Sequence, residues 1–380
     1  MSKNNKKKKI VWQEYIVLVF FILIGAACGI LMTSNLENNF DTNKSATEDI
    51  LLMVVEFVFM FIAIFVHLII HEAGHLIFGM LTGYKFSSFR IMSFMWVKEE
   101  EGIRFRRLSI AGTGGQCLMN PPDFVDGKIP VVLYNLGGSL MNIIAGLICL
   151  SLYFVFSNND LFSVIMLMSA VIGFAIAIMN GVPMRMGTVD NDGYNAFSLT
   201  RNSSSMRAFW VQMKVNEQIS KGVRLKDMNE EWFKIPEDKD MKNSMVATIA
   251  VFAANRLMDL HEFEEADKLM EHMLKIESGI VGLHRNLLVC DRVFIELITE
   301  NRREAIGRML SKEQKNFMKQ MKNFPSVIRT EYAYALLGEK DSLKAEELKV
   351  KFEKCAKAYP YQSDIQSERE LMEIAAKSVV

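Results

Sequence analysis

The sequence predicts an α-helical polytopic membrane protein that carries a β-hairpin between two of its spans and ends in an all-α soluble domain. Half of the 380 residues are hydrophobic, and the long apolar runs all lie before residue 183. From about Asn202 the chain becomes charged and helical in pattern. The formal net charge is zero, so no overall field indicates a nucleic-acid partner.

Four apolar stretches are long enough to cross a bilayer, which needs about 20 residues of helix. They begin near residues 10, 50, 131 and 161, and the last ends near residue 182. The first follows a run of lysines, as in a signal peptide, but it is too long and no clear cleavage site ends it. We therefore expect a retained anchor.

The basic residues predict one orientation for all four spans. Segments rich in lysine and arginine stay in the cytosol. The N-terminus holds the lysines at positions 6–9, and the segment between the second and third spans is also basic. The loop after the first span is acidic, and the link 157–160 has no basic residue. Both termini should therefore be cytosolic, in a multi-pass protein of the cell membrane.

The motif His71-Glu72-Ala73-Gly74-His75 directly follows the second apolar run. Histidines four residues apart on a helix share one face and bind one zinc ion, while the adjacent Glu72 takes a proton from a metal-bound water. Ionisable groups at membrane depth are costly and usually functional. The sequence therefore predicts a catalytic site with one Zn²⁺ on His71 and His75, and Glu72 as the general base.

The sequence supports less specific interpretations of the other ionisable and thiol groups. His67, one turn before the motif, is read as a neutral packing histidine in preference to a proton shuttle. Glu56 is read as snorkelling or paired. The five cysteines form no CxxC pair, which excludes a zinc ribbon and a disulfide framework.

A catalytic zinc needs a third protein ligand and one open position. The cytosolic end of the fourth span offers Asp190 and Asp192. Pro183 should end the helix, and Gly193 permits a tight turn near the metal. The predicted topology places this segment at the same membrane face as His71, so either aspartate can complete the site.

These motifs resemble those of the site-2 protease family of intramembrane metalloproteases. That family follows its HExxH with an Asn-x-x-Pro…Asp-Gly motif whose aspartate is the third zinc ligand. The matching residues are Asn180, Pro183, Asp192 and Gly193. About four additional residues separate Pro183 from the aspartate, which keeps Asp190 as a rival. The resemblance favours Asp192, because Gly193 follows it.

Two further segments resemble the same family, over roughly residues 50 to 200. The stretch 137–145 looks like the middle core helix, in which Asn142 either orients the active site or substrate backbone, or forms only an interhelical hydrogen bond. The β-like stretches 86–97 and 103–110, joined by the turn 99–102, look like the membrane-associated β-loop of the family. A strand edge there would hold an unwound substrate by β-augmentation.

The soluble tail contains three similar stretches at residues 262–266, 301–305 and 341–345, with alanines about 40 residues apart. Each precedes an amphipathic helix. The pattern is similar to tetratricopeptide repeats with a wider period, and a plain helical bundle is the alternative. A concave repeat surface would bind a peptide or protein partner.

We therefore expect residues 1–49 to form a basic N-terminus, anchor and outer loop, 50–200 the catalytic membrane core, and 201–380 a helical cytosolic domain. The resemblance implies substrates that are single-pass membrane proteins or leftover signal peptides. The alternative is a catalytically silent scaffold or binding protein in the bilayer that uses its helical domain. The complete set of catalytic residues argues against it.

Overall fold

The computed structural model describes residues 12–38, 46–99, 102–110, 113–156, 160–186 and 189–379. The lysines at positions 6–9, part of the predicted hairpin turn (100–101) and the link 157–159 lie outside the described residues. The chain forms two compact units. One comprises Met1–Thr82 and Pro130–Ser198, and the other comprises Gly83–Ile129 and Leu199–Val380.

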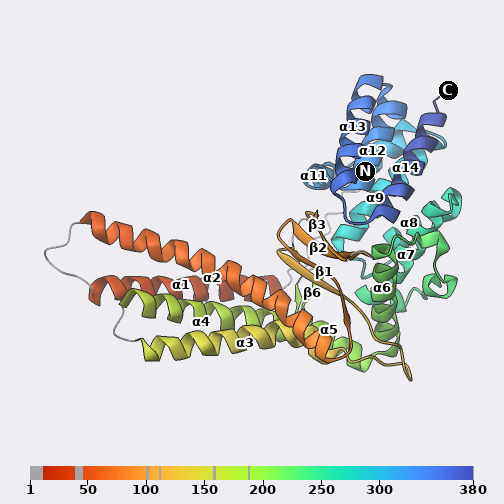
Figure 1. The fold of residues 1–380 in the computed structure, drawn as a ribbon. Coiled ribbons are helices and arrows are strands. Elements are labelled where there is room, and N and C mark those ends of the chain that lie inside the picture. Colours follow the sequence, from red (N-terminus) through yellow and green to blue (C-terminus); the bar gives the residue numbers. More distant parts are fainter. Residues whose placement is uncertain are drawn as a thin grey trace. The chain divides into compact units, whose positions relative to one another are not determined.

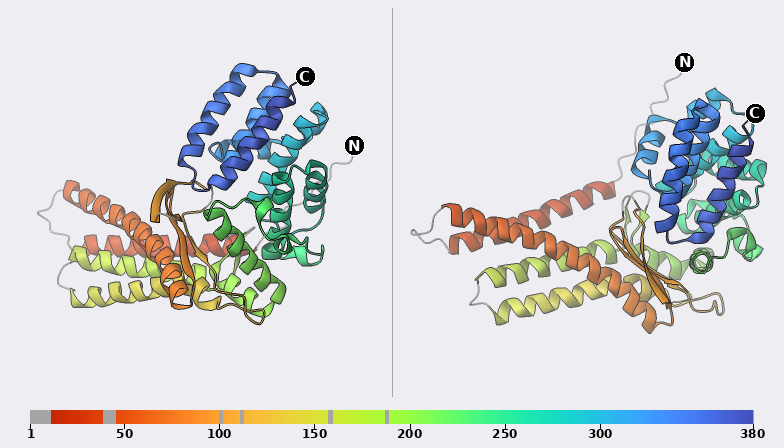
Figure 2. Two further views of the ribbon diagram at one scale, coloured as in Figure 1. Left: turned by 45° about the vertical axis from the view of Figure 1, so that its right-hand side comes forward. Right: turned by 45° about the horizontal axis from the view of Figure 1, so that its top comes forward.

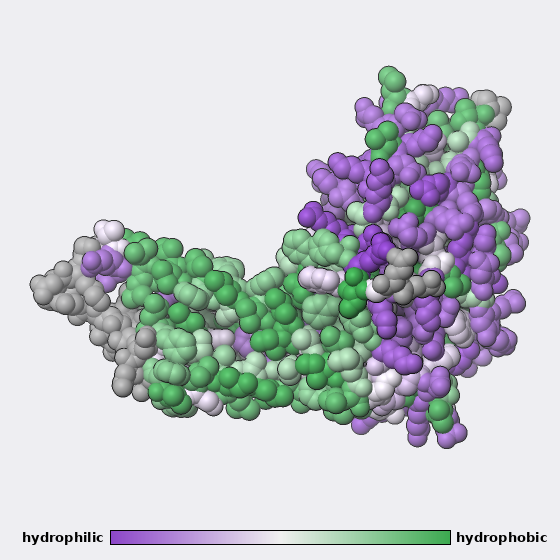
Figure 3. All heavy atoms as spheres, viewed as in Figure 1, coloured by the Kyte–Doolittle hydropathy of each residue, from purple (hydrophilic) through white to green (hydrophobic). Residues whose placement is uncertain are grey.

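The first unit is a bundle of four long helices. These are α1 (Trp12–Asn38), α2 (Ala46–Leu81), α3 (Val132–Val155) and α4 (Asp160–Gly181). Helix α3 packs against α4 and α2, and α1 packs mainly against α4 (Figures 1 and 2). Hydrophobic side chains cover the visible face of this bundle (Figure 3), as expected for helices that face lipid.

Three of these helices are long and apolar enough to cross a membrane. The candidate spans are Thr47–Leu81, Val132–Val155 and Leu161–Gly181. The apolar part of α1 among the described residues, Leu18–Ser34, is shorter. The structure therefore fits a membrane protein, and the count of four spans stays a prediction.

Two glycines bring α2 and α3 into direct backbone contact beside the HExxH motif. A β-carbon on Gly74 would lie 2.3 Å from the carbonyl oxygen of Gly137, and one on Gly137 would lie 2.6 Å from that of Gly74. Small residues allow helices to approach this closely in a bilayer. The turn of α2 that carries the motif is thereby fixed against α3.

The segment between α2 and α3 is a four-stranded antiparallel sheet, and the prediction of one hairpin was incomplete. Its strands are β1 (Lys85–Ile91), β2 (Phe94–Glu99), β3 (Gly102–Arg107) and β4 (Gly115–Asn120), in the order β3-β2-β1-β4. The stretch expected as one strand, 86–97, divides at Met92, whose φ is 54°. Gly, Asn and Asp are the residues that usually occupy this left-handed region. A methionine there does not mark a turn in the sequence.

The rest of the second unit is helical. Its α-helices are α6 (Ser203–Ser220), α7 (Ser244–Asp259), α8 (Phe263–Lys275), α9 (Gly282–Ile298), α10 (Arg303–Met309), α11 (Lys312–Gln320), α12 (Pro325–Ala333), α13 (Ser342–Ala358) and α14 (Gln362–Lys377). Three 3₁₀ turns (Leu225–Asp227, Glu230–Phe233 and Asp240–Lys242) lie between α6 and α7, and a π-helical segment, η4 (Tyr334–Glu339), extends α12. The pairs α7 and α8, α9 and α10, and α12 and α13 pack against each other.

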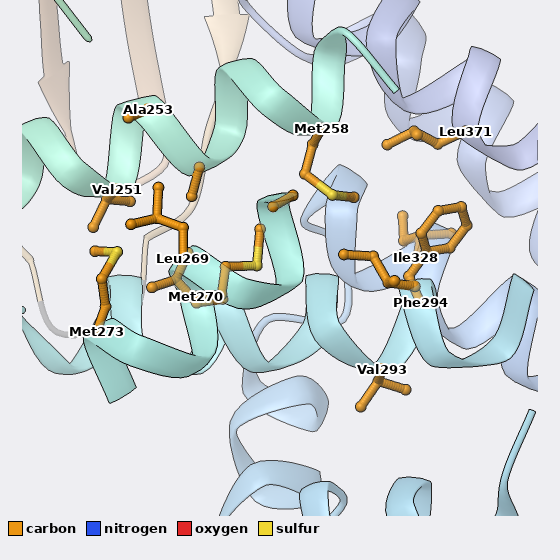
Figure 4. Packing of buried hydrophobic residues seen from close by; sticks show 14 of the residues in the cluster. Val251, Ala253, Met258, Leu269, Met270, Met273, Val293, Phe294, Ile328 and Leu371 are labelled. Atoms are coloured by element: carbon orange, nitrogen blue, oxygen red, sulfur yellow. The ribbon is translucent and has the colours of Figure 1, made fainter. Parts of the chain in front are cut away.

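One apolar core holds the second unit together. Figure 4 shows part of it, where Met270 of α8, Phe294 of α9 and Ile328 of α12 are all fully buried. Met95 and Val97 of β2 belong to the same core. The sheet and the helices therefore stabilise each other as parts of one folded unit.

Candidate metal centre

The HExxH motif lies on an uninterrupted helix. Helix α2 runs through it and ends six residues later at Leu81. The side chains of His71, Glu72 and His75 are buried within the first unit. Because the motif is helical throughout, the two imidazoles project from the same face of α2, one turn apart.

Asp192 completes a group of three donor atoms with these histidines. Its Oδ2 lies 3.0 Å from Nε2 of His71 and 3.4 Å from Nε2 of His75. The two Nε2 atoms are 3.2 Å apart. Bonds of about 2.0–2.1 Å to a tetrahedral zinc ion place neighbouring ligand atoms about 3.3 Å apart. The three donors thus have both the chemistry and the spacing of one face of a zinc tetrahedron.

Asp190, the rival from the sequence, lies elsewhere. It belongs to the two-residue strand β6 (Val189–Asp190), which pairs with β5 (Arg185–Met186) so that Asp190 faces Arg185 across the ladder. Among the described residues, the group whose ligand atoms all lie within 4.8 Å of one another contains Asp192 and not Asp190.

The position of Asp192 depends on Asn191, which the sequence analysis did not single out. Asp192 is the first residue of α5 (Asp192–Arg201), and Asn191 caps that helix. The Asn191 side chain makes four hydrogen bonds: it accepts from the backbone N–H of Met184 (3.0 Å) and Tyr194 (2.9 Å), and it donates to the carbonyls of Met179 (2.7 Å) and Val182 (2.6 Å). The signal available in the sequence was an asparagine directly before a short helix.

The other residues predicted around Asp192 have separate positions. A β-carbon on Gly193 would lie 2.2 Å from the carbonyl oxygen of Gly181, so only glycine allows α5 to approach the end of α4. Pro183 lies just beyond that end and is exposed. The Asn180 amide donates to the carbonyl of Ile176 one turn back on α4, at 3.0 Å. Asn180 is therefore engaged within its own helix.

Residues of α3 contact both histidines of the motif. The Nδ1 of His75 donates to the backbone carbonyl of Tyr134 at 2.8 Å, and its Nε2 is the ring nitrogen that lies toward Asp192. The imidazole of His71 lies against Gly138 of α3, where a β-carbon would be 2.5 Å from its Cε1.

Asn142 of α3 joins His71 to a polar chain inside the bundle. It is fully buried, with Nδ2 3.2 Å from Nδ1 of His71 and Oδ1 3.0 Å from Nδ1 of His67. His67 contacts the hydroxyl of Ser169 at 3.2 Å through Nε2. Both ring nitrogens of His67 therefore have hydrogen-bond partners within the bundle.

The electrostatics favour an ionised Asp192. Burial alone raises the pKa of a carboxyl, but hydrogen bonds from His71 and His75 hold the pKa of Asp192 well below its usual range. The group is therefore an anion at neutral pH, as a metal ligand must be.

A family model, peptidase family M50, matches residues 59–333 of the chain. The chain belongs to peptidase family M50. This is the site-2 protease family, whose members are in general zinc-dependent. The match continues into α12, beyond the residues, roughly 50 to 200, whose motifs resemble the family. No curated protein and no solved structure gives a significant match. Membership supports a membrane metallopeptidase and agrees with the apolar helices.

Proposed function

We propose that this M50 protein is an intramembrane zinc metalloendopeptidase that hydrolyses peptide bonds of membrane-embedded substrates near the cytosolic face. The observation that carries the proposal is the convergence of His71, His75 and Asp192 at the spacing of a zinc tetrahedron. Two of these donors lie on a helix that is long and apolar enough to cross a membrane.

In this proposal His71, His75 and Asp192 hold one zinc ion and leave its fourth position open. Bound zinc activates water for attack and polarises the scissile carbonyl. The two imidazoles bind through Nε2, since Tyr134 occupies Nδ1 of His75 and Asn142 faces Nδ1 of His71. The carboxylate of Asp192 neutralises one of the two positive charges.

Glu72 is assigned as the general base and then the proton donor. It lies beside His71 on α2 and is buried, so bulk water does not compete for its proton. It takes a proton from the attacking water and delivers one to the nitrogen of the leaving amine. Both transfers use the same carboxylate, so no second acid is required.

Asn142 is assigned as the residue that orients His71. A metal-bound Nε2 requires a proton on Nδ1, and that proton needs an acceptor. The amide nitrogen of Asn142 faces His71 in the structure, and a half-turn of the amide exchanges its nitrogen and oxygen, so that the oxygen accepts from His71 and the nitrogen donates to His67. The chain His71, Asn142, His67 and Ser169 then has a donor and an acceptor at every link.

The topology inferred from the basic residues places both termini and the helical domain in the cytosol. Strand β3 is an edge strand of the sheet, and its Ile103 and Phe105 are exposed. We assign this edge to substrate binding by β-augmentation.

The consecutive helix pairs support the assignment of a tetratricopeptide-like array, because Ala266, Ala305 and Ala345 each lie in the second helix of a pair.

A Glu72→Gln variant tests the proposal in cells. Membrane fractions of the native and variant strains are compared for peptides that contain apolar segments. We expect signal-peptide remnants or membrane stubs to accumulate in the variant strain, because glutamine cannot take the proton. If the two peptide populations are identical while partners still co-purify with the chain, the scaffold function replaces proteolysis.

A further inference from the structure

A cavity of about 240 Å³ lies among the helices of the second unit. Its walls come from α7, α9, α12 and α14. The first three of these are each the first helix of a packed pair. In helical repeat proteins the stacked repeats create concave surfaces that bind ligands. This cavity is called the acidic cavity below, for the charges that line it.

Arg329 lies in the wall of the acidic cavity and cannot neutralise its neighbours completely. It is fully buried and hydrogen-bonds both Asp291 and Glu368, the latter at 2.8 Å. Burial raises the pKa of both carboxyls. One guanidinium group thus forms ion pairs with two carboxylates.

Arg224, the second cation in the wall, is shared in the same way. Its Nε lies 3.0 Å from Asp259, and its Nη2 lies 2.7 Å from Glu370. Asp259 also accepts from the backbone N–H of Lys226 at 3.0 Å. The residues that line the acidic cavity include four carboxyl groups and two cations: Asp259, Asp291, Asp364 and Glu368, with Arg224 and Arg329.

Asp364 differs from the other carboxyl groups of the cavity wall. It lines the cavity one turn before Glu368 on α14, and no lysine or arginine among the described residues pairs with it. Its hydrogen bond comes from the hydroxyl of Tyr359. Burial, together with Glu368 and Asp259, raises the pKa of Asp364 to about 7. A cation beside Asp364 would relieve this cost.

An independent feature also indicates a missing ligand. The Nδ1 atom of His284 is buried in the cavity wall and has no hydrogen-bond partner within the part of the chain that the structure describes. Burial lowers the pKa of His284 to about 4, so the ring is neutral and adds no positive charge. A buried polar atom of this kind costs free energy unless a ligand or water reaches it.

We propose that the acidic cavity binds lysine or arginine side chains of the basic segment that flanks a substrate's membrane span on the cytosolic side. The proposal rests on the proposed function and its topology. Apolar side chains of the wall, including Leu287 and Leu371, suit the methylene stem of such a residue, while Asp364 faces its charge. The acidic cavity would then select substrates before the zinc site acts on them.

The chemistry of the substrates supports this partner. Cytosolic flanks of membrane spans carry an excess of lysine and arginine. Signal peptides likewise begin with a positively charged segment. A cavity whose carboxylates outnumber its cations is therefore complementary to the one feature that these substrates share outside the bilayer.

Binding of a labelled peptide to the full chain tests the proposal. The protein carries Glu72→Gln and is held in phosphatidylcholine nanodiscs, so that binding is measured without turnover. The probe is a fluorescent twelve-residue peptide with four consecutive lysines in a neutral Ser/Gly background, and its partner has four glutamates instead. We expect the lysine peptide alone to bind, and high salt to weaken it.

Two variants of the acidic cavity locate the site. Asp364→Asn should weaken binding at least fivefold, and Ser367→Lys, which adds a cation to the wall, should do the same without removing a carboxylate. Glu264→Gln is the matched control, because that glutamate is exposed on α8, and it should leave the affinity within about twofold. Thermal unfolding verifies that each variant is folded.

Unchanged affinity in both folded cavity variants would overturn the proposal, as would equal binding of the glutamate peptide. The outcome is independent of catalysis. A chain that hydrolyses nothing can still bind the lysine peptide, and an active protease can fail to bind it.

Discussion

Gly138 and His71 lie so close together that a β-carbon on Gly138 would be 2.5 Å from the imidazole Cε1 of His71. The nearest atoms belong to the ring itself, including both nitrogens at 2.6 Å. The packing of α3 against α2 therefore fixes the plane of this proposed ligand. Glycine at position 138 is a requirement of the site and not of helix formation.

Gly138→Ala should displace His71 and lower zinc affinity at least tenfold. Alanine has a higher helix propensity than glycine, by about 1 kcal/mol, but the clash costs about 1–3 kcal/mol, so the ring must move. Zinc content after dialysis against a chelator series measures the effect. Gly25→Ala is the control, since open space surrounds Gly25 on α1. Equal zinc affinity in both variants would contradict this reading.

Asn142→Leu should reduce zinc affinity about 10–100-fold, because it removes the amide that contacts Nδ1 of His71 and orients the ring. Asn180→Leu is the matched comparison, since the Asn180 amide donates to the carbonyl of Ile176 on its own helix. We expect it to change zinc affinity by no more than about twofold. The reverse order of the two variants in the same titration would refute the role of Asn142.

Asn191→Ala should lower both thermal stability and zinc affinity. The variant loses the cap of α5 and the hydrogen bonds that hold the segment between α4 and α5. Loss of a helix cap costs about 0.5–2 kcal/mol. Asn191→Asp keeps the acceptor for Tyr194 and should recover part of the stability. A variant that melts normally and holds zinc normally would show that Asp192 is placed by other contacts.

Asp364→Asn should stabilise the second unit at alkaline pH and not at acid pH. The folded pKa of about 7 lies above the ordinary value of 3.8, so the folded state holds a proton that the unfolded state has released. Stability from this group is complete below pH 4 and is lost as the pH rises to about 7. Thermal unfolding at pH 4.5 and pH 8 measures the difference from the native chain. An equal shift of Tm at both values would contradict the unpaired state of Asp364.

The membrane helices and the donor set could be anticipated because their signals are local. The HExxH spacing places two imidazoles on one helix face whatever surrounds it, and an apolar run predicts a span by itself. The choice between Asp190 and Asp192 needed the three-dimensional arrangement. The two aspartates are two positions apart, and the family resemblance favoured Asp192 because Gly193 follows it. In the structure Asp190 lies in the ladder between β5 and β6, and Asp192 belongs to the donor group.

The sheet and the acidic cavity were harder to foresee. The turn at Met92 has no glycine, proline or asparagine to mark it, so β1 and β2 read as one strand. Strand β4 follows the sheet's other strands only after an interruption, and its pairing with β1 is long-range. The cavity joins residues from four helices over more than 100 positions, and no periodic pattern in one helix reveals such a site.

The zinc content of purified protein tests the central claim most directly. The native chain should contain one zinc ion per molecule. Its extended X-ray absorption fine structure should fit two imidazole nitrogens and carboxylate or water oxygen at about 2.0–2.2 Å from the metal. Asp192→Ala should lose the ion under chelation, and Asp190→Ala should retain it. A native chain without zinc, or loss of the ion in Asp190→Ala with retention in Asp192→Ala, would contradict the proposed site.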